Sequence, residues 1–74
     1  MDQATIRRRL VALREARGAT QEQLAAALEF NDRQTLSEIE GGGRAIAFAE
    51  LSKAARYFGV KVDYFTDPLL MAGE

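Results

Sequence analysis

The sequence has no cysteine and no histidine, and these two absences exclude several kinds of chemistry. Without cysteine the chain can form no disulfide and no thiolate–metal bond, and without histidine it lacks the commonest general base and zinc ligand. No apolar run approaches the roughly 18 residues of a membrane-spanning helix, and no basic segment leads into an apolar one at the start. We therefore expect a cytoplasmic protein with no cofactor, no membrane association and no small-molecule substrate.

The chain also lacks the excess of basic residues that marks many nucleic-acid-binding domains. Its formal net charge is −1 and its sequence pI is about 5.4, whereas such domains often have a pI above about 9. Eight of its 10 cationic residues are arginine, the side chain whose planar fork best fits phosphate and guanine. Composition alone therefore leaves the partner open, and the placement of the charges has to decide it.

The length of 74 residues allows one domain. Apolar residues recur at helical spacing and no segment alternates with the period of a strand. We therefore predict an all-α fold, a compact bundle of five short helices, with the domain at 1–66 and a tail at 67–74. The helices are expected at 4–17, 21–28, about 32–40 and 48–58, with a last short turn of helix between 60 and 65.

Local signals mark several helix ends. Gly18 is placed to end the first helix, and Thr20 with Gln23 forms a capping box that opens the second. Asp32 is suited to cap the third helix, and Gly59 to end the fourth. We expect the fourth helix to turn four residues inward, Phe48, Leu51, Ala55 and Phe58.

The segment 20–44 carries the most information about function, because it contains two short helices joined by a turn of about four residues. In the second of these helices Leu36 and Ile39 face inward. The opposite side then presents short or forked polar side chains that suit the edges of base pairs in a major groove, namely Arg33, Gln34, Ser37 and Glu38. Arg33 could contact guanine, Gln34 adenine and Glu38 the amino group of cytosine.

Contacts with the phosphate backbone are expected beside these base-reading residues. The unpaired N–H groups at the start of the second helix, with Gln21 in its first turn, suit a phosphate. Arg44, just after the glycines at 41–43, could hold another. The candidate phosphate-binding residues are Thr20, Gln21, Thr35 and Arg44. The three consecutive arginines at 7–9 are interpreted mainly as a solvated face.

Three stretches resemble the XRE family of phage-repressor and Cro-like helix-turn-helix proteins: TQEQLA at 20–25, RQTLSEIE at 33–40, and Gly42 with Arg44. The resemblance covers about 6–65. It implies a lambda-repressor-like fold and a transcriptional regulator, a repressor, that binds double-stranded DNA sequence-specifically. It also implies that Gln21 contacts phosphate, that residues 33, 34 and 38 read bases, and that Arg14 and Glu40 form a structural ion pair.

The chain departs from the family pattern in the turn between the two helices, at 29–32. This turn is one residue longer than usual, and Glu29 stands where the family tends to have glycine. A left-handed backbone conformation there would be less accessible than with glycine. Gly43 likewise stands where a phosphate-binding lysine is common.

Apolar residues gather near the C-terminus, and we expect them to form the contact of a symmetric homodimer on a pseudo-palindromic operator: Tyr64, Phe65, Leu69 and Leu70. The alternative is a protein-interaction module, such as an antitoxin that neutralises a partner protein. An enzyme is not expected, because Glu38 and Glu40 point about 200° apart around a helix and the glycines lack the lysine of a phosphate-binding loop.

Overall fold

The computed structural model describes residues 2–67, which form five helices and no strand. These are α1 (Gln3–Ala16), α2 (Gln21–Ala27), α3 (Arg33–Glu40), α4 (Phe48–Phe58) and α5 (Asp63–Thr66). The predicted all-α bundle is confirmed, and the ends of the first four helices agree with the sequence to within one residue. None of the described helices is long and apolar enough to cross a membrane.

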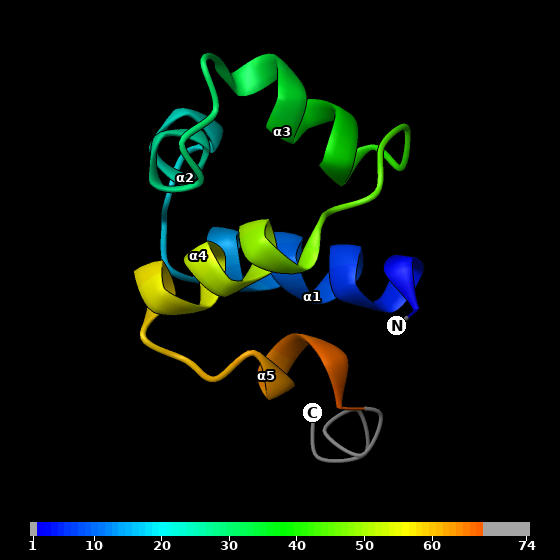
Figure 1. Cartoon of the computed structure of the whole chain (residues 1–74). Coiled ribbons are helices and arrows are strands. Elements are labelled where there is room, and N and C mark those ends of the chain that lie inside the picture. The colour runs from blue at the N-terminus through cyan, green and yellow to red at the C-terminus, as the bar shows by residue number, and fades with distance from the viewer. Residues whose placement is uncertain (1, 68–74) are drawn as a thin grey trace.

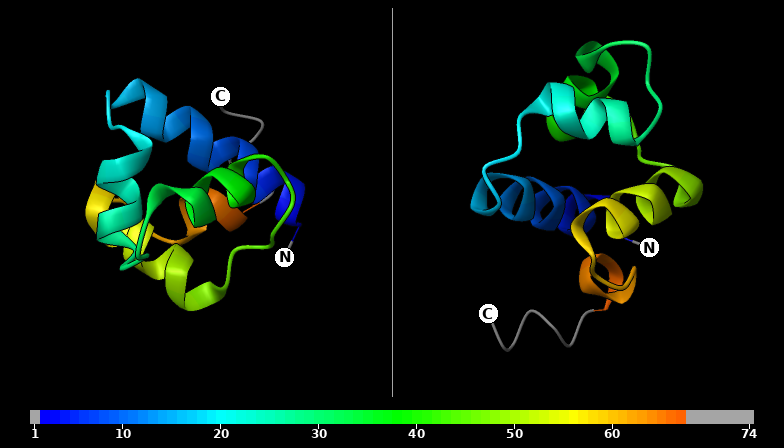
Figure 2. Two further views of the ribbon diagram at one scale, coloured as in Figure 1. Left: turned by 90° about the horizontal axis from the view of Figure 1, so that it is seen from above. Right: turned by 90° about the vertical axis from the view of Figure 1, so that its left-hand side faces the viewer.

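The helices lie at three levels (Figures 1 and 2). Helices α2 and α3 occupy one end of the molecule, α1 and α4 cross its middle, and α5 lies on the far side. Every helix contributes at least one large side chain with no exposed surface: Leu10, Leu24, Leu36, Leu51 and Phe65. One hydrophobic core therefore holds all five helices. Helix α3 is fixed to this core by Leu36 and Ile39.

The sequence signals at the junction of α1 and α2 are present as expected. Gly18 follows α1 with φ of +69°, a left-handed conformation that glycine adopts without a steric penalty. The N–H of Gln23 donates to the Thr20 hydroxyl at 3.0 Å, and the N–H of Thr20 donates to Gln23 Oε1 at 2.9 Å. This reciprocal capping box sets the point at which α2 begins.

The expectation that Phe48 packs inward is wrong, since 61% of its surface is exposed. Phe48 lies in the first turn of α4, beyond the edge of the core. Ile46, two residues earlier, is 2% exposed and fills that edge of the core instead. The buried side of α4 begins one turn later, with Leu51, Ala54, Ala55 and Phe58.

The interpretation of residues 7–9 as a solvated face is wrong for Arg9, which is 3% exposed. Its Nη1 atom donates to the carbonyl oxygens of Tyr64, at 3.2 Å, and Asp67, at 2.8 Å. A guanidinium satisfies such carbonyl groups at the end of a short helix, which have no partner within the helix. Arg9 therefore anchors the end of α5 to α1.

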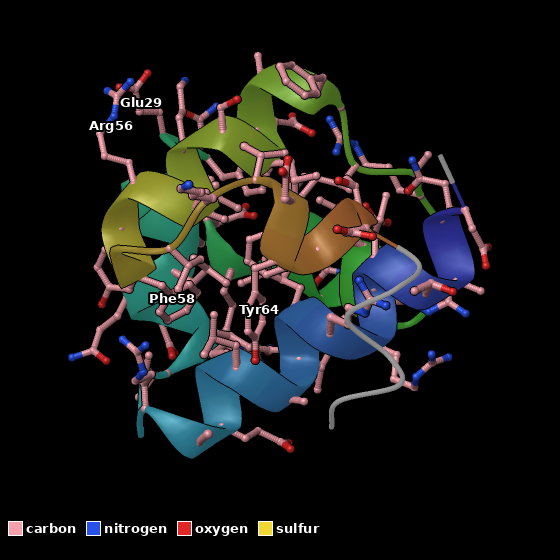
Figure 3. The ribbon with its side chains drawn as sticks, turned by 90° about the horizontal axis from the view of Figure 1, so that it is seen from below. Glu29, Arg56, Phe58 and Tyr64 are labelled. Atoms are coloured by element: carbon pink, nitrogen blue, oxygen red, sulfur yellow. The ribbon has the colours of Figure 1, made fainter. Side chains whose placement is uncertain are left out.

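The residues predicted to form a dimer contact have different surroundings. Phe65 is fully buried in the core of its own chain and meets Tyr64 edge-on, with ring centroids 5.5 Å apart. Phe65 therefore has no surface to offer a second protomer. Tyr64 is half-buried, and Figure 3 shows it and Phe58 lying among the helices. Leu69 and Leu70 lie outside the described residues.

Candidate nucleic-acid interface

Helix α3 presents a polar side to solvent while its apolar side is locked against the core. Leu36 is 0% and Ile39 2% exposed, and Asp32 caps the helix by accepting a hydrogen bond from the N–H of Gln34 at 3.0 Å. On the outer side Arg33, Gln34 and Glu38 are exposed, and Thr35 and Ser37 are half-buried. The helix lies at the end of the molecule opposite α5 (Figure 1), where a duplex could approach it.

A chain of hydrogen bonds connects α1, α2 and both ends of α3. Arg14 Nε lies 2.7 Å from Glu40 Oε2, and Nη2 lies 2.9 Å from Oε1, so the expected ion pair is present. Gln21 Nε2 donates to the same Glu40 Oε1 at 2.9 Å, and Gln21 Oε1 accepts from Arg33 Nη1 at 3.3 Å. The ion pair thus holds the side chain of Gln21 in position, and Gln21 in turn holds the side chain of Arg33, the first residue of α3.

The buried ion pair also affects the chemistry of Arg14. The hydrogen bonds that Arg14 donates to Glu40 raise the pKa of Arg14 further above its usual value, against the effect of burial. The guanidinium is therefore a permanent charge that cannot leave Glu40 without a large desolvation cost. Gln21 keeps one amide N–H beyond its bond to Glu40, because a side-chain amide carries two donor hydrogens. That hydrogen is available for a phosphate oxygen.

Arg44 is already engaged within the chain, which the sequence did not indicate. Its Nη1 and Nη2 atoms donate to the two carboxylate oxygens of Glu50 at 3.0 and 2.9 Å. Its guanidinium also lies over the ring of Phe30, 5.5 Å from the centroid. The hydrogen bonds from Arg44, and then the N–H of Ala47, lower the pKa of Glu50 below its usual value although burial opposes them. A phosphate at Arg44 would have to compete with Glu50.

Arg33 is held more loosely than Arg44. Its Nε atom lies 3.7 Å from Glu22 Oε2, and both side chains are more than half exposed. Exposed pairs of this kind contribute little to stability. Arg33 can therefore leave Glu22 and contact a base with little loss of stability.

The long turn before α3 adopts the left-handed conformation without glycine. Glu29 has φ of +65°, and the N–H groups of Glu29 and Phe30 close the end of α2 on the carbonyl oxygens of Ala26 and Ala25, each at 3.0 Å. Lys53 Nζ on α4 lies 2.9 Å from Glu29 Oε1. The turn therefore keeps the helix-ending geometry that glycine usually provides, at the cost of backbone strain.

One cavity of about 240 Å³ lies between the end of α2 and α4, lined by Ala27, Glu29, Lys53, Arg56 and Tyr57. Figure 3 shows Glu29 and Arg56 extending outward together at one edge of the molecule. Its walls carry both signs of charge, and Glu29 is paired with Lys53. The cavity therefore has no clear preference for a charged ligand.

Residues 10–65 match a family model described as helix-turn-helix, which covers most of the chain and includes α2, α3 and the turn between them. No curated protein and no solved structure matches the chain.

Proposed function

The chain belongs to the helix-turn-helix family of DNA-binding regulators, and on this premise we propose that it is a repressor that reads the major groove of double-stranded DNA with α3. The observation that carries this proposal is the division of α3 into two sides. Leu36 and Ile39 are buried, whereas Gln34 and Glu38 are exposed. A major groove about 12 Å wide admits one helix, and a helix supported in this way enters it as a rigid element.

In this proposal the outer side chains of α3 divide the base contacts among them. Arg33 takes the O6 and N7 atoms of guanine, and Gln34 takes N6 and N7 of adenine. Glu38 accepts from the amino group of cytosine, and Ser37 contributes a hydroxyl that suits several bases. The exposure of residues 33, 34 and 38 supports this assignment.

The phosphate contacts come from side chains around α3. Gln21 offers its free amide hydrogen, Thr20 and Thr35 offer hydroxyl groups, and Arg44 offers a guanidinium once Glu50 releases it. Such contacts set the register of a protein on the duplex and carry no direct sequence information.

The regulator acts as a homodimer that blocks transcription by occupying its operator. Tyr64 and the tail residues Leu69 and Leu70 form the proposed contact between protomers. Two copies of α3 would then enter successive major grooves about 34–36 Å apart on a pseudo-palindromic site.

Selection of binding sites from a pool of randomised duplexes tests this proposal. It predicts enriched half-sites related by two-fold symmetry, one helical turn apart, and an affinity that falls log-linearly with salt. Enrichment of single half-sites would contradict the dimer, and an unenriched pool would contradict sequence-specific reading.

A second candidate function is a protein-interaction module such as an antitoxin, which the exposed aromatic residues of α4 favour. Phe48 is 61% and Tyr57 45% exposed, and Tyr57 borders the cavity beside α2. A double change of Phe48 and Tyr57 to serine distinguishes the two candidates. If α3 is the functional surface, the double variant binds duplex DNA as the wild type does. If α4 contacts a protein partner, the double variant binds that partner more weakly, and the affinity for the partner depends little on salt.

A further inference from the structure

The loop between α3 and α4 is attached to the first two turns of α1. Gln3 Nε2 donates to the carbonyl oxygen of Ile46 at 3.1 Å, and the N–H of Ile46 donates back to Gln3 Oε1 at 3.0 Å. Arg7 lies one helical turn further along α1 and therefore on the same side of it. Its guanidinium packs against Gly42, near the start of the same loop.

Gly42 leaves the space that this guanidinium occupies. A Cβ atom at Gly42 would lie 3.2 Å from Arg7 Nη1 and 3.4 Å from Arg7 Cζ, and the φ of +87° at Gly42 is one that other residues rarely adopt. The planar group therefore rests directly on the backbone two residues after the end of α3. The contact fixes where the charge of Arg7 lies relative to α3.

Arg7 differs from the other cations around α3 because no acid among the described residues pairs with it. Arg14 pairs with Glu40, Arg33 with Glu22 and Arg44 with Glu50. Within residues 2–67, Arg7 forms no hydrogen bond or ion pair. A guanidinium is always charged and carries five N–H donors, so those of Arg7 are open to an external anion.

We propose that Arg7 binds a DNA phosphate beside the C-terminal end of α3, a contact that rests on the proposed function. Helix α3 has eight residues and is therefore about 12 Å long, which is about the width of the major groove. The end of such a helix approaches the sugar–phosphate backbone at the edge of the groove. Arginine suits this position because its fork binds two phosphate oxygens at once.

The experiment measures the affinity of the full chain for one selected duplex and one random duplex over a series of salt concentrations. The test variants are Arg7→Gln and Arg7→Lys. The control is Lys61→Gln, which removes the same charge from an exposed side chain in the segment between α4 and α5, on the side away from α3 (Figure 1). Thermal unfolding followed by circular dichroism establishes that each variant is folded.

Arg7→Gln is expected to weaken binding to both duplexes about threefold to tenfold. It should also make the negative slope of log affinity against log salt shallower by about 0.9. Arg7→Lys should retain part of the affinity and the full slope, and Lys61→Gln should behave as the wild type. A further variant, Gly43→Lys in the Arg7→Gln background, should restore the slope. A Cβ at Gly43 has only one ordinary contact, at 3.7 Å from the Glu38 carbonyl oxygen, so a side chain fits there.

Two different failures can be told apart. If the wild type binds and Arg7→Gln matches Lys61→Gln in affinity and slope, the contact at Arg7 is wrong and the proposed function stands. If the wild type binds neither duplex in a salt-dependent way, the proposed function fails and the contact at Arg7 fails with it.

Discussion

Arg44 and Glu50 face each other at the start of α4, with Nη1 3.0 Å from Oε1 and Nη2 2.9 Å from Oε2. The same Glu50 Oε1 also accepts the N–H of Ala47 at 2.9 Å. Glu50 therefore has two roles, since it caps α4 and holds the cation expected to bind phosphate. The two roles lead to separate predictions for DNA affinity and for stability.

Replacing Glu50 with glutamine should tighten DNA binding. The change removes the charge that competes with phosphate for Arg44, and we expect about threefold higher affinity for specific and random duplexes alike. Arg44→Ala should weaken both duplexes alike. The control is Asp63→Asn, which makes the same change of charge on α5, at the opposite end of the molecule (Figure 1). If Glu50→Gln binds no more tightly than Asp63→Asn, Glu50 does not restrain Arg44.

Glu50 should also contribute to the loss of stability in acid. Arg44 lowers its pKa in the folded state below the usual 4.5, so its stabilising effect is fully present above that value and is lost as the pH falls through the folded-state pKa. Glu50→Gln should cost about 1 kcal/mol near pH 6, because Arg44 is partly exposed, and this cost should shrink as the pH falls below the usual 4.5. Urea unfolding over this pH range measures the cost.

Arg44→Met should make the free energy of unfolding depend less on pH in the acid range, since it removes the main cause of the lowered pKa of Glu50. Parallel stability profiles of the wild type and both variants between about pH 6 and pH 3 would contradict the assignment.

Glu40→Ala should destabilise the fold strongly. The side chains of Arg14 and Glu40 are only 13% and 8% exposed, and removing one partner of a buried pair leaves the other charge uncompensated, at a cost of about 3 kcal/mol. Glu22→Ala is the matched control, because its pairing with Arg33 is long and exposed and should contribute less than about 1 kcal/mol. Equal urea midpoints for the two variants would show that the pair at Glu40 is not structurally important.

The sequence predicted the helices well because their ends depend on local interactions. Gly18 and the Thr20–Gln23 capping box act within a few residues, and such signals can be read from neighbouring positions. The buried residues of α3, Leu36 and Ile39, also follow from helical spacing. Spacing could not show where the core ends along a helix, and this is why Phe48 was placed inside.

The side-chain partners could not be predicted in the same way, because they depend on how the helices pack. Arg9 and Tyr64 lie 55 positions apart in the chain, and Arg7 and Gly42 are also far apart in the sequence. Helical spacing places Arg9 on the side of Ile6 and Leu13, but it does not indicate that the partners of Arg9 are carbonyl groups at the end of α5. The glycine at 42 was the one signal for Arg7 in the sequence, and a glycine indicates a turn as readily as a close side-chain contact.

Replacing Glu29 with glycine should stabilise the protein. Glu29 has φ of +65°, a conformation that costs a residue with a Cβ atom about 1–2 kcal/mol. Glu29→Ala is the matched control, because both changes remove the ion pair with Lys53 and only alanine keeps the Cβ atom. In urea unfolding, the free energy of unfolding of the glycine variant should be about 1 kcal/mol higher than that of the alanine variant. An alanine variant as stable as the glycine variant would mean that the turn relaxes and carries no strain.

Replacing Gln34 with alanine should relax base choice while leaving the general affinity for DNA intact. Gln34 is exposed on the outer side of α3, and a bidentate contact with adenine contributes about 1–3 kcal/mol of discrimination. Competition between the selected duplex and one with that base pair changed measures this loss, and Arg44→Ala provides the contrast because it weakens both. The affinity of Gln34→Ala for random duplex should stay within about twofold of the wild type. An equal loss on both duplexes would place Gln34 at the phosphates and shift the register of α3 in the groove.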